Sequence, residues 1–158
     1  KEFPSDFRQI RYFTLLVVQM APPEIKEINL LEQQVSELIK NAVKHGNKND
    51  TKKKVKIWYK FTTDYAHIIV KDEGEGFKNL DEWNSFNERR TDCFLKQDFE
   101  HMAQYVSFRT AKSDENDGGN ALFAAVEYWN GGVVFNHKKN CVAVKKNFPK
   151  KRHGVKIN

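Results

Sequence analysis

Two neighbouring segments alternate apolar and polar residues with the period of a β-strand, and they constrain the fold more than any other feature. The segments are "VKIWYKFTT" (55–63) and "AHIIVKDE" (66–73), and they meet at Asp64–Tyr65. The first alternates Val55, Ile57, Tyr59 and Phe61 with Lys56, Trp58 and Lys60. Such alternation is typical of a strand with one buried face, and the short connection predicts an antiparallel hairpin.

The order of the remaining segments predicts what the hairpin packs against. Residues 6–20 read as a helix that ends at the double proline Pro22–Pro23, and a longer helix follows from about Glu24 to His45. After the hairpin we expect a helix around 98–105, another near Ala121, and a final hairpin from "GVVFN" and "CVAVKKNF". This order predicts an α/β two-layer sandwich, a mostly antiparallel sheet with helices over one face.

The length of 158 residues fits one domain with a hydrophobic core. We assign residues 1–148 to a single domain, 77–108 to a lid region or insertion within it, and 149–158 to a basic C-terminal tail. The net charge of +6 is concentrated in Lys52–Lys54 and in the C-terminal "KKNFPKKRHGVK". A basic tail can bind nucleic acid or simply remain solvated, but aromatic residues are not interleaved with it as a stacking surface requires.

Cysteine content and hydropathy bear on the compartment. Cys93 and Cys141 lie in unlike contexts without metal-ligand spacing, which favours a reduced, cytoplasmic setting. The most apolar run, "YFTLLVVQMAPP", stops at its prolines well short of a membrane span, so we expect no membrane association.

A polar stripe runs along the second predicted helix, in "SELIKNAVKHG" (36–46). Glu37, Asn41, Lys44 and His45 share one side at helical spacing. The core stripe, formed by Leu31, Val35, Leu38 and Ala42, lies roughly 110° away at about 100° per residue. The polar groups therefore line the margin of the core, either as one wall of a cleft or as a solvated helix face.

Glycines follow the second strand of the hairpin. "IIVKDEGEGF" places Asp72 at the strand end, with Gly74 and Gly76 after it. A carboxylate there can accept a hydrogen bond from a ligand amine while glycines let backbone approach closely, although the same pattern suits a tight turn. A further segment, "DGGNALF", sets Gly118 and Gly119 before the helix near Ala121.

These segments in this order resemble the GHKL (Bergerat-fold) ATPases, and among them the anti-sigma-factor serine kinases. "SELIKNAVKHG" is similar to the family's N-box, with Glu37, Asn41, Ala42, His45 and Gly46 in the matching positions. "DEGEGF" is similar to its G1 box, and "DGGNALF" to the G2 box that ends its ATP lid. The resemblance covers roughly residues 25–147.

The resemblance implies a site for ATP and Mg²⁺. It assigns Asp72 to the adenine amino group, Gly74 and Gly76 to close backbone approach, Asn41 to Mg²⁺ and Lys44 to the phosphates. Glu37 becomes the general base that takes a proton from the attacking hydroxyl or water. Gly118, Gly119 and Asn120 become the phosphate-binding end of the lid.

The same resemblance implies partners: a sigma-factor-like protein, a small antagonist protein that accepts phosphate on serine, and a second copy of the chain in a homodimer. Two departures leave an alternative open. The lid's G-x-G pair is replaced by "GGNA", and residues 77–108 exceed the compact kinase's lid region. The chain is thus either an ATP-dependent protein kinase or a catalytically inactive interaction module of the same fold.

Overall fold

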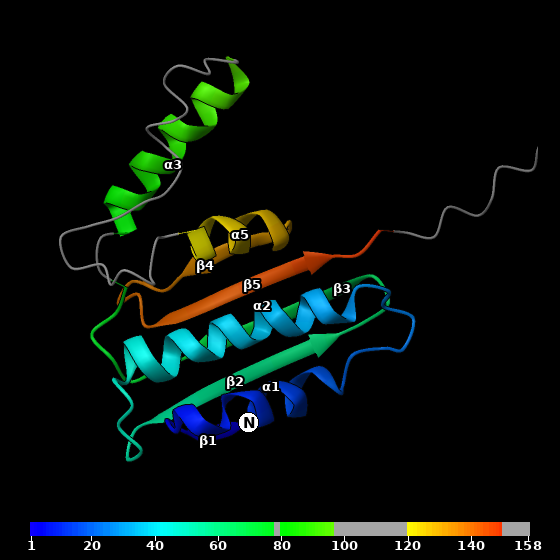
Figure 1. Cartoon of the computed structure of the whole chain (residues 1–158), viewed down its shortest axis with the longest axis vertical. Helices are drawn as coiled ribbons and strands as arrows, with labels where there is room; N and C mark the ends of the chain where they lie inside the picture. The colour runs from blue at the N-terminus through cyan, green and yellow to red at the C-terminus, as the bar shows by residue number, and fades with distance from the viewer. Residues whose placement is uncertain (78–79, 97–119, 150–158) are drawn as a thin grey trace, which may run out of the picture. The chain divides into compact units, whose positions relative to one another are not determined.

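The computed structural model describes residues 1–77, 80–96 and 120–149 (Figure 1). The chain divides into two compact units. The first contains Lys1–Gly76 and Tyr128–Asn158, and the second contains Phe77–Glu127. No helix of the described part is both long and apolar enough to cross a membrane.

The first unit is built on a five-stranded sheet in the order β1-β2-β3-β5-β4, in which every pair of neighbours is antiparallel. Its strands are β1 (Glu2–Pro4), β2 (Lys54–Phe61), β3 (Tyr65–Lys71), β4 (Gly132–Phe135) and β5 (Cys141–Asn147). Both predicted hairpins are present, as β2–β3 and β4–β5. Strand β1 was not predicted, because three residues are too few to show an alternation.

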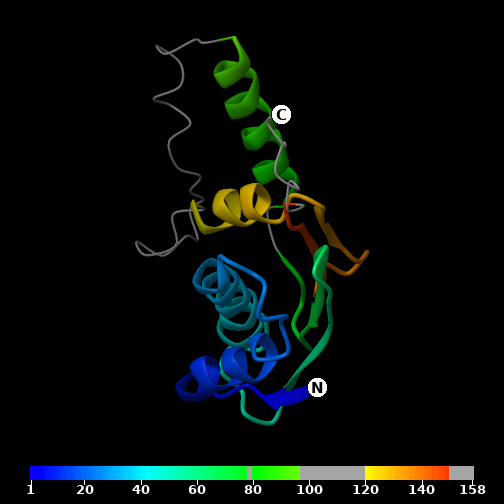
Figure 2. The same ribbon diagram turned by 90° about the vertical axis from the view of Figure 1, so that its right-hand side faces the viewer.

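Helices α1 (Ile10–Val18) and α2 (Ile28–Lys40) cover one face of this sheet (Figure 2). In β2 the residues facing them are buried or half-buried, while those between are exposed, so the predicted alternation is confirmed. A short 3₁₀ turn, η1 (Phe7–Gln9), leads into α1, and the Phe3 ring of β1 stacks on Phe13 of α1 at 4.3 Å between centroids. The predicted two-layer α/β sandwich is confirmed.

Helix α2 differs from its prediction in where it begins and in which side chains it buries. It begins at Ile28 and not at Glu24. A turn follows Pro22–Pro23 and separates the two prolines from the start of the helix. Leu31, Val35 and Ile39 are fully buried, whereas Leu38 is only half-buried. The core stripe therefore follows an i, i+4, i+8 row through Ile39.

The second unit contains α3 (Leu80–Leu95) and most of α5 (Asn120–Tyr128). Helix α5 was predicted, whereas α3 was missed because its apolar residues are few among many charges. Trp83 and Phe86 of α3 contact Phe123 of α5, with ring centroids 5.1 and 5.7 Å apart. The helix predicted around 98–105 lies outside the described residues.

The side chain of Asn47 joins three segments of the first unit. It is fully buried. Its Nδ2 donates to Ser5 Oγ at 2.8 Å and to the Lys54 carbonyl at 3.0 Å, while its Oδ1 accepts from the Glu73 N–H at 2.7 Å. Ser5 Oγ in turn donates to the Lys53 carbonyl at 2.8 Å. This amide therefore ties the segment after β1, the start of β2 and the loop after β3 to the end of the second helix.

We expect Asn47→Ala to lower the free energy of unfolding by about 1–3 kcal/mol, because it leaves buried donors and acceptors without partners. Asn29→Ala, an exposed position on α2, should change it by less than about 0.5 kcal/mol. Urea denaturation measures both. Equal stabilities of the two variants would contradict the structural role of Asn47.

Candidate functional site

The predicted polar stripe lies at the helix margin and not in the core. Glu37 is half-buried and its Oε1 lies 3.9 Å from Lys40 Nζ, while Asn41, Lys44 and His45 are exposed. Lys44 Nζ lies 5.9 Å from the centre of the Phe7 ring. These side chains are thus accessible to a ligand or to solvent.

The α-helix does not continue through this stripe. From Asn41 to Gly46 the backbone forms a π-helical turn, η2, in which the Asn47 N–H donates to the Ala42 carbonyl at 2.8 Å. The angular arithmetic of an α-helix therefore does not hold beyond Asn41, and this is a correction to the prediction. Single π-turns are rare and frequently lie at functional sites.

The end of this turn packs against the loop after β3. A Cβ atom on Gly46 would overlap the Asp72 carboxylate, and a Cβ on Gly74 would overlap the Gly46 carbonyl group. Only residues without side chains fit at both positions. The tertiary structure thus brings Gly46, from the end of the second helix, against Asp72 and Gly74 of the glycine segment after β3.

The Asp72 carboxylate is half-buried at this contact. Its Oδ1 accepts from the Gly74 N–H at 2.7 Å. Burial raises the pKa of the Asp72 carboxyl above its ordinary value, while the Gly74 hydrogen bond and the ammonium groups of Lys138 and Lys53 oppose that rise. Among the described residues, no donor bonds to Oδ2, which leaves this oxygen for a ligand.

Asn140 positions Asp72, and the sequence reasoning missed it. The Asp72 N–H donates to the Asn140 carbonyl at 2.9 Å, and Asn140 Nδ2 donates back to the Asp72 carbonyl at 3.2 Å. Asn140 is itself held by Asn136, whose Oδ1 accepts from the Asn140 N–H at 3.0 Å. The two asparagines in "NHKKN" were the available signal, because this residue commonly orders turns with its side chain.

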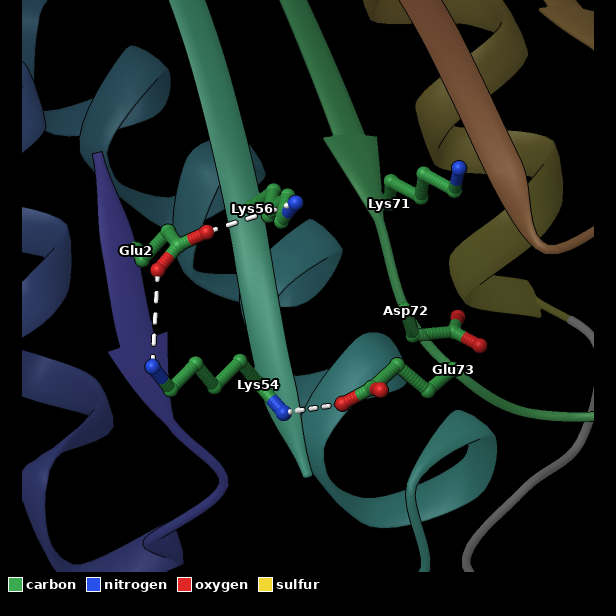
Figure 3. A pocket seen from close by; sticks show the side chains of 6 residues that line it. All are labelled: Glu2, Lys54, Lys56, Lys71, Asp72 and Glu73. Atoms are coloured by element: carbon green, nitrogen blue, oxygen red, sulfur yellow. Dashed lines mark hydrogen bonds and ion pairs between the residues drawn. The ribbon is translucent and has the colours of Figure 1, made fainter. Parts of the chain in front are cut away.

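A hollow of about 340 Å³ lies beside Asp72 (Figure 3). It is lined by Glu2, Lys54, Lys56, Lys71, Asp72 and Glu73. Glu2 forms ion pairs with Lys56 at 3.3 Å and with Lys54 at 3.6 Å, and Glu73 Oε2 accepts from the Lys54 backbone N–H at 2.6 Å. The hollow contains Asp72 but neither Glu37 nor Asn41, so it is not the whole of the predicted cleft.

The other predicted residues are placed as follows. Gly76 lies against the turn between β4 and β5, where a Cβ would overlap the Lys138 carbonyl. Asn120 is the first residue of α5. Gly118 and Gly119 lie outside the described residues. Within the described part, no hydrogen bond or ion pair joins Glu37 or Asn41 to Asp72, so their assembly into one site stays a prediction.

The comparisons with known proteins agree with these motifs. A family model described as the histidine kinase-like ATPase domain matches residues 3–132. An anti-sigma F factor from Geobacillus thermodenitrificans (strain NG80-2) is 37% identical over 65 residues, which are 41% of this chain and 44% of that protein. An anti-sigma F factor from Shouchella clausii (strain KSM-K16) is 35% identical over 60 residues, which are 38% of this chain and 41% of that protein. The matched part is thus less than half the length of either relative.

We expect Gly76→Ala to destabilise the protein more than Gly132→Ala. Both glycines have positive φ, +99° and +120°, but an added Cβ meets the Lys138 carbonyl only at Gly76 and meets no atom within 4 Å at Gly132. The strained backbone alone costs about 1–3 kcal/mol, and the overlap adds to it. Thermal unfolding compares the two variants, and an equal loss would mean that the Gly76 contact contributes nothing.

We also expect Asp72→Asn to gain stability relative to wild type as the pH rises from about 3 to 7. Burial raises the pKa of Asp72 in the folded protein. The contribution of Asp72 to the free energy of unfolding is therefore complete below its unfolded pKa of about 3.9, and it is lost as the pH rises through its folded pKa. The side-chain amide of the Asp72→Asn variant does not ionise, so the variant does not lose this stability as the pH rises. Urea denaturation at a series of pH values measures the difference.

Asp6→Asn is the control, because its stability relative to wild type should change with pH in the opposite direction. The Arg8 side chain hydrogen-bonds the Asp6 carboxylate and lowers its pKa, so the stability from that charge is present above the unfolded pKa and is lost as the pH falls. This variant should lose stability relative to wild type as the pH rises. If both variants change in the same direction, the assigned cause at Asp72 is wrong.

Proposed function

Because the chain belongs to the histidine kinase-like ATPase family, we propose that it is an ATP-binding regulatory switch protein that acts as an anti-sigma-factor-type serine kinase. The anti-sigma F factors among its relatives suggest a sigma-factor-like protein and a small antagonist protein as partners. A cytoplasmic location belongs to the same proposal, in keeping with the free thiols of Cys93 and Cys141. The observation that carries it is the contact of Gly46 and Gly74 with the Asp72 carboxylate.

The Asp72 contact suits the adenine end of ATP. Oδ1 is occupied by the Gly74 N–H, and Oδ2 is left to accept from an exocyclic amino group. Gly46 and Gly74 keep side chains away from the carboxylate, so a planar base can approach it. Asn140 and Asn47 fix the backbone on either side, at Asp72 and at Glu73, which holds the carboxylate in place before a ligand arrives.

The N-box residues suit the phosphate end. Asn41 offers an amide oxygen, a ligand type that Mg²⁺ accepts, and Lys44 offers a positive charge for phosphate. Among the described residues, no group of three His, Cys, Asp or Glu side chains could hold a metal by itself. Mg²⁺ would therefore rely on Asn41 together with the phosphates and water, as it commonly does at nucleotide sites.

Glu37 is the proposed base for transfer. Bound ATP would supply the γ-phosphoryl group. The Glu37 carboxylate would take the proton of the attacking serine hydroxyl. The serine oxygen would bond to the γ-phosphorus as the bond from that phosphorus to ADP breaks and ADP leaves. The ion pair between Glu37 and Lys40 is weak, because the charged atoms are 3.9 Å apart and both side chains are about one-third or more exposed. The Glu37 carboxylate can therefore move toward such a hydroxyl.

A second candidate is a nucleotide-binding module without transfer. It is favoured by the lid sequence, where Gly118 and Gly119 are followed by Asn120, which already lies in helix α5. In the family's lid, glycine at this point lets the backbone amides of the helix N-terminus reach phosphate, and this sequence replaces that glycine. Turnover distinguishes the two candidates.

We expect wild type to bind ATP with Mg²⁺ and to prefer it over GTP, whose six-position carries an oxygen and cannot donate to Asp72. Asp72→Asn should weaken ATP binding by about tenfold or more, since a hydrogen bond to a charged group contributes about 1.5–3 kcal/mol. The same variant should narrow the preference for ATP over GTP. Calorimetry with each nucleotide measures both effects.

Glu37→Gln is the matched test of chemistry. It should retain ATP affinity and lose ADP production by hydrolysis, in which water accepts the γ-phosphoryl group in place of the serine hydroxyl; chromatography of the nucleotides follows the reaction. Wild-type ATP binding without any ADP production would favour the module. Absence of ATP binding by wild type at millimolar concentration would reject the proposed function, and equal turnover in Glu37→Gln would reject Glu37 as the base.

A further inference from the structure

The sheet of the first unit has a face opposite α1 and α2, which we call the open face (Figure 2). A row of apolar residues crosses it from strand to strand. Trp58 pairs with Ile69, Ile69 with Ala143, and Ala143 with Val134. Trp58 is 50% exposed and Val134 is 66% exposed. This apolar row, Trp58–Ile69–Ala143–Val134, is therefore accessible across β2, β3, β5 and β4.

Basic rows lie on both sides of the apolar row. Toward one end of the strands Lys56 pairs with Lys71, and toward the other Lys60 pairs with His67 and His67 with Lys145. The hollow beside Asp72 borders the first basic row, where Lys56 and Lys71 are seen (Figure 3). Among the described residues, the ion pairs on this face are those of Glu2 with Lys54 and Lys56. The face therefore carries a net positive charge that its own acids do not neutralise.

The spacing of these rows matches a helix. Four strands about 4.8 Å apart make the apolar row about 14 Å long, the length of roughly ten helical residues. Each basic row lies two residues along the strands, about 6.7 Å from the apolar row, which is near the radius of a helix with its side chains. An apolar stripe on such a helix would cover the apolar row, and acidic residues beside the stripe would meet the lysines.

We propose that the open face is a docking surface for an acidic amphipathic helix of a protein partner. This inference does not depend on nucleotide binding. Charge complementarity selects the occupant, because acidic side chains of a partner would be attracted to Lys60, Lys71 and Lys145. A second copy of the chain would set these lysines against one another. Single-stranded nucleic acid commonly stacks its bases on several aromatic side chains, and Trp58 is the one aromatic residue of the apolar row.

The test uses a fluorescent 14-residue helical peptide with a leucine stripe flanked by glutamates, and a matched peptide with lysines in place of the glutamates. Wild type should bind the glutamate peptide at least tenfold more tightly than the lysine peptide. The double variant Lys60→Glu/Lys145→Glu and the single variant Val134→Asp should each weaken binding of the glutamate peptide about tenfold or more. Lys26→Glu, an exposed charge reversal between α1 and α2, is the control and should bind as wild type does.

Melting curves that match wild type check that the variants fold, since the changed side chains are exposed. The proposal would be overturned if Lys26→Glu weakened binding of the glutamate peptide as much as the variants of the open face do. Equal affinity of wild type for the two peptides would also overturn the proposal. So would a wild-type dimer, seen by sedimentation, that Val134→Asp converts to a monomer, because the face would then belong to a second copy. Binding of a single-stranded oligonucleotide that only the double variant abolishes would assign the face to nucleic acid instead.

Discussion

The buried amide of Asn47 is the interaction on which the rest of the site depends. It bonds to the segment after β1, to the first residue of β2 and to the loop after β3, and it immediately follows the π-turn. A fully buried amide costs free energy unless its donors and acceptors are paired, so this position admits few alternative arrangements. By fixing these segments, Asn47 sets how closely Gly46 approaches Asp72.

The surroundings of Asp72 disfavour the charged form of its carboxyl group. Burial raises the pKa of this carboxyl group, which means that its charged form is less stable here than it would be in water. The Gly74 amide and two lysines reduce that effect of burial without removing it. Such a perturbed carboxyl beside closely packed glycines is typical of a functional site, and the family match agrees with it.

The two faces of the sheet differ in their side chains. The face under α1 and α2 is mostly apolar and forms the core, while the open face carries basic rows on both sides of one apolar row. The period of two along each strand separates these sets, and the pairing register aligns them across strands. The proposed nucleotide recognition at Asp72 and the proposed docking on the open face can therefore be tested by separate substitutions.

Much of this fold could be predicted from the sequence, because alternation in 55–61 and 65–71 and the helical stripe from Leu31 are local patterns set by backbone geometry. The motifs also indicated the histidine kinase-like ATPase family, which the family match confirms, while the roles of Glu37, Asn41 and Asp72 stay predictions. The tertiary structure alone decided the π-turn at 41–46, the roles of Asn47 and Asn140, and the contact of Gly46 with Asp72. Asn47 reaches Ser5 and Glu73, which lie 42 and 26 positions away in the sequence, and Asn140 reaches Asp72 across 68 positions. Local periodicity carries no record of such contacts, because they form only when separate elements pack together.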